Sequence, residues 1–119
     1  MTDNVLREWT NNVYDYNVRM YVDKPTGVFL IWEAPAPDGY EWEHFALLRR
    51  EHGDGFQYAA YIDAGCSCNS PMDTDPDRYA LQWFYTKQEP KAKLQRALRD
   101  SYFLSEHKKA EARSTLRNA

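Results

Sequence analysis

The sequence predicts an α+β fold, in which a four-stranded antiparallel sheet in meander order is followed by two C-terminal helices packed on one of its faces. Segments with strand-like periodicity follow one another from about residue 13 to residue 63, with no helical segment between them to make a parallel crossover. Apolar residues at helical spacing come only after residue 76. The chain has 119 residues, with nine Tyr, five Phe and four Trp, which suits a single domain with one core that needs no disulfide.

The first two predicted strands form a hairpin. Residues 13–22 alternate between apolar and polar side chains, as in a half-buried strand. Residues 24–27 are Lys-Pro-Thr-Gly, which is turn composition, and the apolar run GVFLIWEA that follows predicts a more buried strand. The sequence APAPDG at residues 34–39 should end this strand, because proline cannot donate to a sheet ladder.

The third and fourth predicted strands form a second hairpin. Residues 40–50 begin with clean alternation and become apolar on both faces towards their end. The segment EHGDG supplies the glycines of a tight connection to the fourth strand, residues 56–63. These two hairpins complete the predicted meander.

Two helices are predicted after the sheet. Asp75 suits an N-cap and Pro76 a first helical position, which predicts a helix over about residues 76–88. Pro90 can open a second helix over about residues 90–110, with an apolar stripe flanked by basic residues. From His107 onward the stripe fades, and the segment to residue 119 is predicted to be a frayed, solvated end.

The most distinctive segment connects the sheet to the helices, and we call residues 64–75 the cysteine loop. It holds both cysteines of the chain, Cys66 and Cys68, among small and turn-forming residues. A disulfide between residues this close would be strained, so we expect reduced thiols. One interpretation is a metal or redox site that adds Asp63 and Asp73 or Asp75 to the thiols. The other, which we prefer, is a packed loop with small apolar thiols and no cofactor.

Enzymatic activity is not predicted. Glu41, Glu43 and His44 could supply acid and base groups, but alternate carboxylates on a strand are typical of its solvated face. The chain contains no nucleophile elbow, zinc-protease, phosphate-binding or dinucleotide-binding motif. The two cysteines and three histidines also lack the spacing of a structural zinc site.

Charge is distributed unevenly along the chain. Residues 1–86 carry six Lys or Arg against 14 Asp or Glu, and residues 87–119 carry nine against four. Four basic residues of the second predicted helix could contact phosphates, namely Lys91, Lys93, Arg96 and Arg99. The acidic body would repel a nucleic acid, so we rank this partner below a protein, and the asymmetry leaves a homo-oligomer open. The sequence has no apolar run of membrane-spanning length and no signal-peptide pattern, which predicts an intracellular protein without a membrane partner.

The aromatic residues favour a protein contact surface. Seven of them are not expected to fit together inside so small a domain: Tyr21, Trp32, Trp42, Tyr58, Tyr61, Trp83 and Tyr85. The alternative is that they fill the interface between sheet and helices. We expect the contact surface to combine the cysteine loop with the adjoining strand ends, because recognition residues are commonly mounted on such loops. The predicted contact residues are Tyr61, Asp63, Asn69 and Met72.

Residues 39–71, GYEWEHFALLRREHGDGFQYAAYIDAGCSCNSP, carry a resemblance to a known group. A strand that begins with Tyr and acidic or aromatic residues, a hairpin, and the loop Gly-Cys-Ser-Cys-x-x-Pro together resemble small proteins encoded by phages of actinobacteria. The resemblance implies no activity, but it implies a phage product made in the bacterial cytoplasm that acts on a host or phage protein. After the loop, Met72-Asp73-Thr74-Asp75 departs from the group's Trp-Glu-Asp type continuation.

Taken together, the sequence predicts a non-catalytic protein-binding module, a phage accessory factor that modulates a host or phage protein. The alternative is a small metal-binding or nucleic-acid-associated regulator that uses the cysteine loop or the basic helix.

Overall fold

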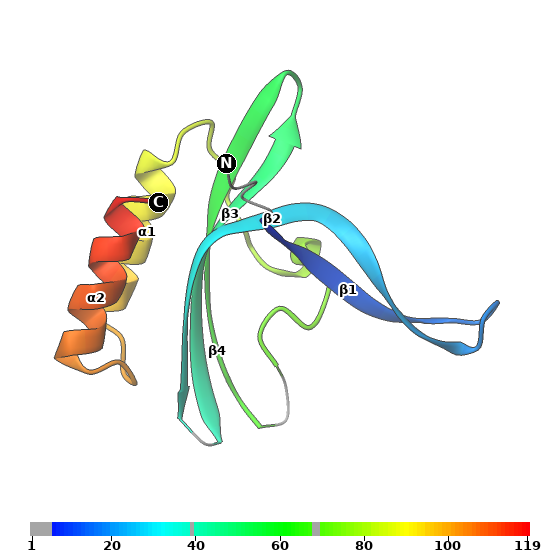
Figure 1. Cartoon of the computed structure of the whole chain (residues 1–119), viewed down its shortest axis with the longest axis horizontal. Coiled ribbons are helices and arrows are strands. Elements are labelled where there is room, and N and C mark those ends of the chain that lie inside the picture. Colours follow the sequence, from blue (N-terminus) through cyan, green and yellow to red (C-terminus); the bar gives the residue numbers. More distant parts are fainter. Residues whose placement is uncertain (1–5, 39, 68–69) are drawn as a thin grey trace, which may run out of the picture.

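The computed structural model describes residues 6–38, 40–67 and 70–119, with the side chains of 36–38 left out. Four strands form one curved antiparallel sheet in the order β1-β2-β3-β4 (Figure 1). They are β1 (Arg7–Asp15), β2 (Met20–Asp38), β3 (Glu41–His52) and β4 (Gly55–Cys66). A 3-10 helix, η1 (Pro76–Arg78), precedes α1 (Gln88–Arg99) and α2 (Glu106–Arg117). The predicted α+β fold, with a meander sheet followed by two C-terminal helices, is confirmed.

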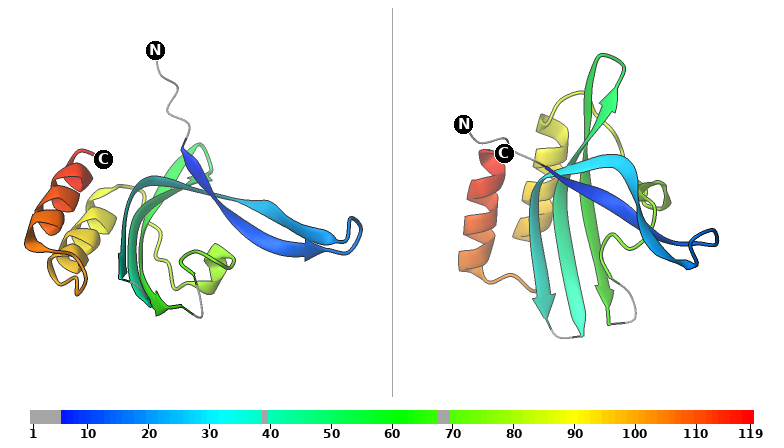
Figure 2. Two further views of the ribbon diagram at one scale, coloured as in Figure 1. Left: turned by 60° about the horizontal axis from the view of Figure 1, so that its bottom comes forward. Right: turned by 45° about the vertical axis from the view of Figure 1, so that its right-hand side comes forward.

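The sheet buries both of its faces. Figure 2 shows α1 and α2 along one face, and the irregular segment that contains η1 along the other. The helix-side core consists of Trp32, Phe45, Leu47, Leu94, Leu98 and Leu116. The loop-side core consists of Trp9, Val28, Leu30, Ala46, Leu48, Ala59 and Tyr61, with Met72, Tyr79, Leu81 and Trp83 packed against it. The molecule therefore has three layers: helices, sheet and an irregular covering segment, residues 70–83.

Strand β3 contributes to both cores. Phe45 and Leu47 face the helices, whereas Ala46 and Leu48 face the covering segment, and each is at most 2% exposed. Successive strand residues point to opposite faces, so a continuous apolar run is what a strand buried on two sides requires. The predicted hairpin between β3 and β4 is confirmed, and Gly53 at its first loop position has the positive φ of +59° that a type II′ turn needs.

The helical layer docks through a narrow apolar stripe. Pro90, Leu94 and Leu98 recur every four residues on the buried side of α1. Helix α2 begins at the N-cap Ser105, whose hydroxyl accepts from the Lys108 amide at 3.2 Å. Near its end, Leu116 is fully buried, and the Trp32 indole donates to the Thr115 hydroxyl at 2.9 Å. The prediction of a frayed, solvated end was wrong, because this segment completes the helix-side core.

The first hairpin also differs from the prediction. The predicted strand over residues 13–22 runs through the turn at residues 16–19, and β1 and β2 pair on either side of it. Tyr14, Tyr16, Val18 and Met20 keep a period of two across this turn, so periodicity alone could not reveal it. Local chemistry makes the turn: the Asp15 carboxylate accepts from the Asn17 amide at 2.8 Å. The predicted turn at residues 24–27 instead lies inside β2, beside the register shift between Glu8 and Thr10.

The helices begin and end at other places than predicted. The capping signal was correct, since the Asp75 carboxylate accepts from the Asp77 amide, but only Pro76–Arg78 are helical. The predicted helix to residue 88 fails because Phe84 instead pairs with Tyr58 of β4, while Tyr79 packs on Trp9. The predicted helix over residues 90–110 is two helices, separated by residues 100–105.

The docking of α2 gives a stability prediction. Leu116→Ala should lower the free energy of unfolding by about 2–5 kcal/mol, because it leaves a cavity in the helix-side core. Arg117→Ala, on the exposed neighbour, is the matched control and should change it by less than about 0.5 kcal/mol. Urea unfolding followed by tryptophan fluorescence measures both. Equal stabilities of the two variants would contradict the docking of α2.

Candidate functional site

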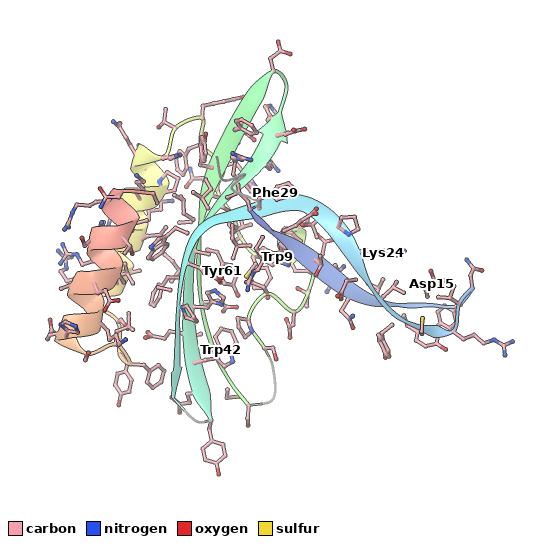
Figure 3. All side chains as sticks on the ribbon, viewed as in Figure 1. Trp9, Asp15, Lys24, Phe29, Trp42 and Tyr61 are labelled. Carbon is pink, nitrogen blue, oxygen red and sulfur yellow. The ribbon has the colours of Figure 1, made fainter. Side chains whose placement is uncertain are left out.

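The predicted contact residue Tyr61 is buried. Its side chain is 1% exposed and belongs to the loop-side core, so its assignment as a surface anchor was wrong. The Trp9 and Tyr79 rings meet it edge-on, with ring centroids 5.3 and 5.1 Å away. Figure 3 shows Trp9 and Tyr61 on the concave side of the sheet. The physical reason is that Tyr61 lies on the same strand face as Ala59, towards the covering segment.

Two of the other predicted contact residues, Asp63 and Met72, help to hold the cysteine loop. The Tyr61 hydroxyl donates to the Asp63 carboxylate at 2.8 Å and accepts from the Met72 amide at 3.1 Å. Burial raises the pKa of the Tyr61 phenol above its ordinary value, and the hydrogen bond to Asp63 acts in the same direction. Met72 is half-buried and has a left-handed φ of +57°. Asn69 lies outside the described residues.

A second polar group lies beside Tyr61, and of its members only His44 was singled out from the sequence. Glu33 on β2 accepts from Arg7 of β1 at 3.0 Å and bonds the His44 Nε2 of β3 at 2.8 Å. His44 is 4% exposed, and its Nδ1 has no hydrogen-bond partner among the described residues. Burial lowers the pKa of His44, although the bond to Glu33 opposes this shift. The group therefore ties three strands together around a neutral imidazole.

Of the two cysteines, only Cys66 lies within the described residues. Cys66 is exposed at the end of β4, where it pairs in register with Glu41, and Cys68 lies outside the described residues. Asp63, the carboxylate proposed to join them in a metal site, is bonded to Tyr61 and to the Ala64 amide. Among residues 6–38, 40–67 and 70–119, no three His, Cys, Asp or Glu side chains are grouped as metal ligands would be.

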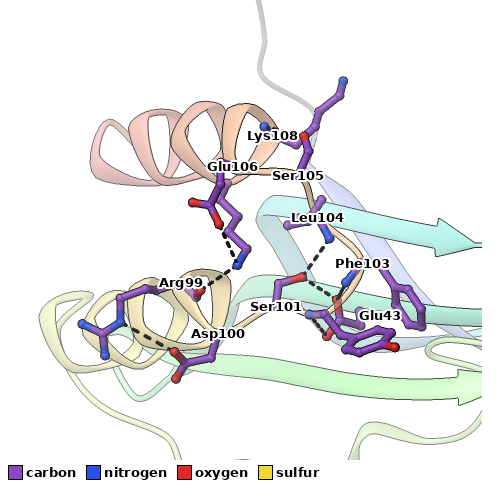
Figure 4. A network of polar contacts seen from close by, with 11 residues as sticks. Glu43, Arg99, Asp100, Ser101, Phe103, Leu104, Ser105, Glu106 and Lys108 are labelled. Carbon is purple, nitrogen blue, oxygen red and sulfur yellow. Dashed lines mark hydrogen bonds and ion pairs between the residues drawn. The ribbon is translucent and has the colours of Figure 1, made fainter.

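Glu43, one of the acid and base candidates, serves the helical layer. Its carboxylate accepts from the Ser101 hydroxyl at 2.5 Å and from the Phe103 amide at 3.1 Å, within the linker between α1 and α2 (Figure 4). The Tyr102 amide adds a third, longer bond at 3.3 Å. Such an arrangement of amide and hydroxyl donors suits a carboxylate that fixes a turn. Glu41 is exposed on the same strand face.

The four basic residues named for nucleic-acid contact all belong to α1. The Lys91 amine donates to the Arg117 carbonyl at 3.3 Å, and the Lys93 amine donates to the Gln82 side chain at 2.8 Å. Arg96 is exposed, and the exposed Arg99 lies 3.7 Å from Asp100. Two of the four are thus engaged within the fold. No helix in the described part of the chain is long and apolar enough to cross a membrane.

The aromatic side chains divide into an inner and an outer set. Trp32, Trp42 and Tyr61 are buried, in line with the alternative that they fill the interior. Tyr21 and Tyr85 are 68% and 70% exposed. Tyr21 belongs to a larger exposed group on residues 12–23, the outer part of the first hairpin, which we call the arm. The large apolar members of this group are Tyr14, Tyr16, Val18, Met20 and Tyr21.

The arm projects from the body of the protein. Figures 1 and 2 show it extending beyond the rest of the sheet, and Asp15 in Figure 3 marks its far end. None of its residues is buried. The Tyr14 ring meets the Tyr16 ring at 4.9 Å and the Tyr21 ring at 5.2 Å, so three tyrosines form one edge-to-face cluster. A signal for this surface was present in the sequence, because five large apolar residues lie in or beside the turn, but the turn itself was not recognised.

Removal of the Tyr61 hydroxyl should loosen the cysteine loop. Tyr61→Phe keeps the ring but leaves the Met72 amide and the Asp63 carboxylate without this partner, which should cost about 1–3 kcal/mol of stability. The control Tyr85→Phe removes an exposed hydroxyl and should have little effect. Urea unfolding of both variants tests this expectation. If Tyr61→Phe is as stable as the original protein, the hydroxyl does not hold the loop.

His44 should make stability depend on pH. Its pKa is lowered in the folded protein, whereas the pKa of an unfolded histidine is about 6.5. Below about pH 6.5 the unfolded chain therefore binds a proton at His44 that the folded chain does not yet bind. The stability due to neutral His44 is present above this pH and is lost as the pH falls towards the folded-state pKa. Urea unfolding between about pH 7.5 and 5.5 should show a slope of up to about 1.4 kcal/mol per pH unit that His44→Gln removes. An unchanged slope in His44→Gln would contradict this assignment.

Comparisons with protein-family models, with curated proteins and with solved structures found no match to this chain. No activity is therefore transferred to any of its residues from a relative. Function is therefore inferred from the geometry of the arm and of the strand edges.

Proposed function

We propose that this protein is a non-catalytic protein-binding module and that the arm is its contact surface. The observation that carries the proposal is the exposure of large apolar side chains on a segment that projects from the body. Tyr16 is 83% exposed, and Val18, Met20 and Tyr21 are each more than half exposed. Contiguous exposed apolar groups of this kind commonly mark a surface that another protein covers.

The composition of the arm supports a protein partner. Tyrosine and methionine are enriched in the central parts of protein interfaces, and tyrosine is among the residues that contribute most binding energy. Tyr14, Tyr16 and Tyr21 are held against one another, so they lose little conformational freedom when a partner covers them. A two-stranded hairpin is only marginally stable by itself, and a partner that packs on it would supply the missing contacts.

The non-catalytic part of the proposal has separate support. Glu43 fixes the linker between α1 and α2, and His44 lies inside the sheet on Glu33. Two of the three residues that suggested acid and base chemistry, Glu43 and His44, thus have structural contacts. A phage setting, with a host or phage protein as partner, is suggested by the sequence resemblance alone and remains a prediction. The contact surface proposed here replaces the one predicted around Tyr61.

Photo-crosslinking in the cells that naturally make the protein would test the arm. A benzophenone amino acid at position 16 should give a discrete protein adduct, because this position lies within the covered surface. The same amino acid at position 40 is the matched control, since Tyr40 is 81% exposed but lies outside the arm. Adducts at position 40 with none at position 16 would contradict the proposal.

The captured partner then allows an affinity measurement. Tyr16→Ser and Tyr21→Ser should each weaken binding by about 1–3 kcal/mol, the range of interface anchors, while the urea unfolding transition stays unchanged. Tyr40→Ser should leave the affinity unchanged. If the arm variants bind the partner as tightly as the original protein, another surface makes the contact.

A further inference from the structure

The outer edge of β4 has main-chain groups that point away from the sheet. The two-residue loop of Gly53 and Asp54 closes on His52 and Gly55, which makes this a hydrogen-bonded pair of the β3–β4 ladder. Bonding alternates along the strand, so every second residue from Phe56 onward directs its N–H and C=O away from β3. Tyr58 fits this phase, because its amide and carbonyl bond Phe84 at 2.7 and 2.8 Å.

At Ala60 and Ile62 the same edge has no main-chain partner among the described residues. Ala60 and Ile62 are the next two residues whose main-chain groups point outward, and within the described residues no main-chain bond from another segment reaches them. Residues 79–82 run beside this edge but stay away from it, and a cavity of about 320 Å³ separates the two. Ile62 is 49% exposed, in keeping with this opening.

The opening has the shape and chemistry of a site for one further strand. Phe84 already adds to β4 in the antiparallel sense, so the edge geometry accepts such pairing. The lining of the opening includes Tyr79, Leu81 and Lys93 of α1, whose amine donates to the Gln82 side chain at 2.8 Å. Lys87 and Lys93 approach the Tyr58 and Phe84 rings at 5.7 and 5.1 Å, so the α1 side of this edge is positively charged.

We propose that Ala60–Ile62 form a strand-addition site for an extended, acidic segment of a partner protein. Main-chain hydrogen bonds to Ala60 and Ile62 would supply the pairing, as in other peptides that extend a sheet edge. Side chains of the added strand alternate between two faces, so its acidic residues meet Lys93 and its apolar residues meet Tyr79 and Leu81. This site is separate from the arm and does not depend on the function proposed for the arm.

The test uses a short synthetic peptide of alternating valine and glutamate, capped at both ends, as the probe. Amide hydrogen exchange by NMR should show that the peptide protects the Ala60 and Ile62 amides, which exchange quickly without it. A peptide with lysine in place of glutamate is the charge control and should bind at least about tenfold more weakly. Protection of β1 amides instead, or of none at peptide concentrations up to about 1 mM, would overturn the proposal.

Two substitutions separate main-chain from side-chain recognition. Ile62→Pro removes an outward N–H without breaking the β3–β4 ladder. It should weaken the binding of the glutamate peptide by about tenfold, whereas Ile62→Val should bind this peptide as tightly as the original protein does. Lys93→Glu should reverse the preference between the two peptides. Unchanged binding by a folded Ile62→Pro protein would overturn the proposal. If this variant does not fold, the amide protection and the Lys93→Glu reversal decide the question. Size-exclusion chromatography of the original protein is a further test. A dimer that pairs through the β4 edges would overturn the proposal, because a second copy would then occupy the site in place of the acidic segment.

Discussion

The burial of β3 on both faces is the constraint on which the rest of the structure depends. Phe45, Ala46, Leu47 and Leu48 are consecutive and almost fully buried, although neighbouring strand residues point to opposite sides. Both sides of the sheet therefore need a cover. The two helices provide one, and residues 70–83, in which only η1 is helical, provide the other. Because both faces are occupied, the surfaces left for recognition are the edges of the sheet and the arm that extends from it.

A carboxylate of the sheet takes part in the hydrogen bonds that hold each cover. Glu43 of β3 holds the linker between α1 and α2 through Ser101 and Phe103. Asp63 of β4 accepts from the Tyr61 hydroxyl, which in turn accepts from the Met72 amide of the cysteine loop. Carboxylates bound to backbone donors and hydroxyls contribute more than neutral hydrogen bonds do. Glu43, Asp63 and Tyr61, which the sequence suggested as catalytic or contact residues, therefore take part in hydrogen bonds that hold the layers together.

The sequence was sufficient for the fold class but not for the surface. The β3–β4 hairpin was predictable because a clear alternation, an apolar run and a glycine turn all agree on it. The turn of the arm was not, because Tyr14, Tyr16 and Met20 keep a strand period straight through it. Tyr61 and Tyr16 could not be told apart as inner and outer residues, since only the curvature of the sheet brings Trp9 onto Tyr61. The docking of α2 could not be predicted either, because Leu116 is the main residue that α2 contributes to the helix-side core, and one leucine in a polar helix does not indicate a buried face.

The arm and the β4 edge differ in the kind of recognition that they allow. β1 and β4 are the two edge strands of the sheet, and the arm belongs to the β1 side. On the arm the exposed groups are side chains, so shape and apolar contact would select the partner. On β4 they are main-chain groups beside Lys87 and Lys93, so any extended acidic segment of suitable length could pair, and selectivity must come from the walls at Tyr79 and Leu81. A chain whose sheet faces are both closed can thus still offer two independent contacts, one specific by side chains and one by strand geometry.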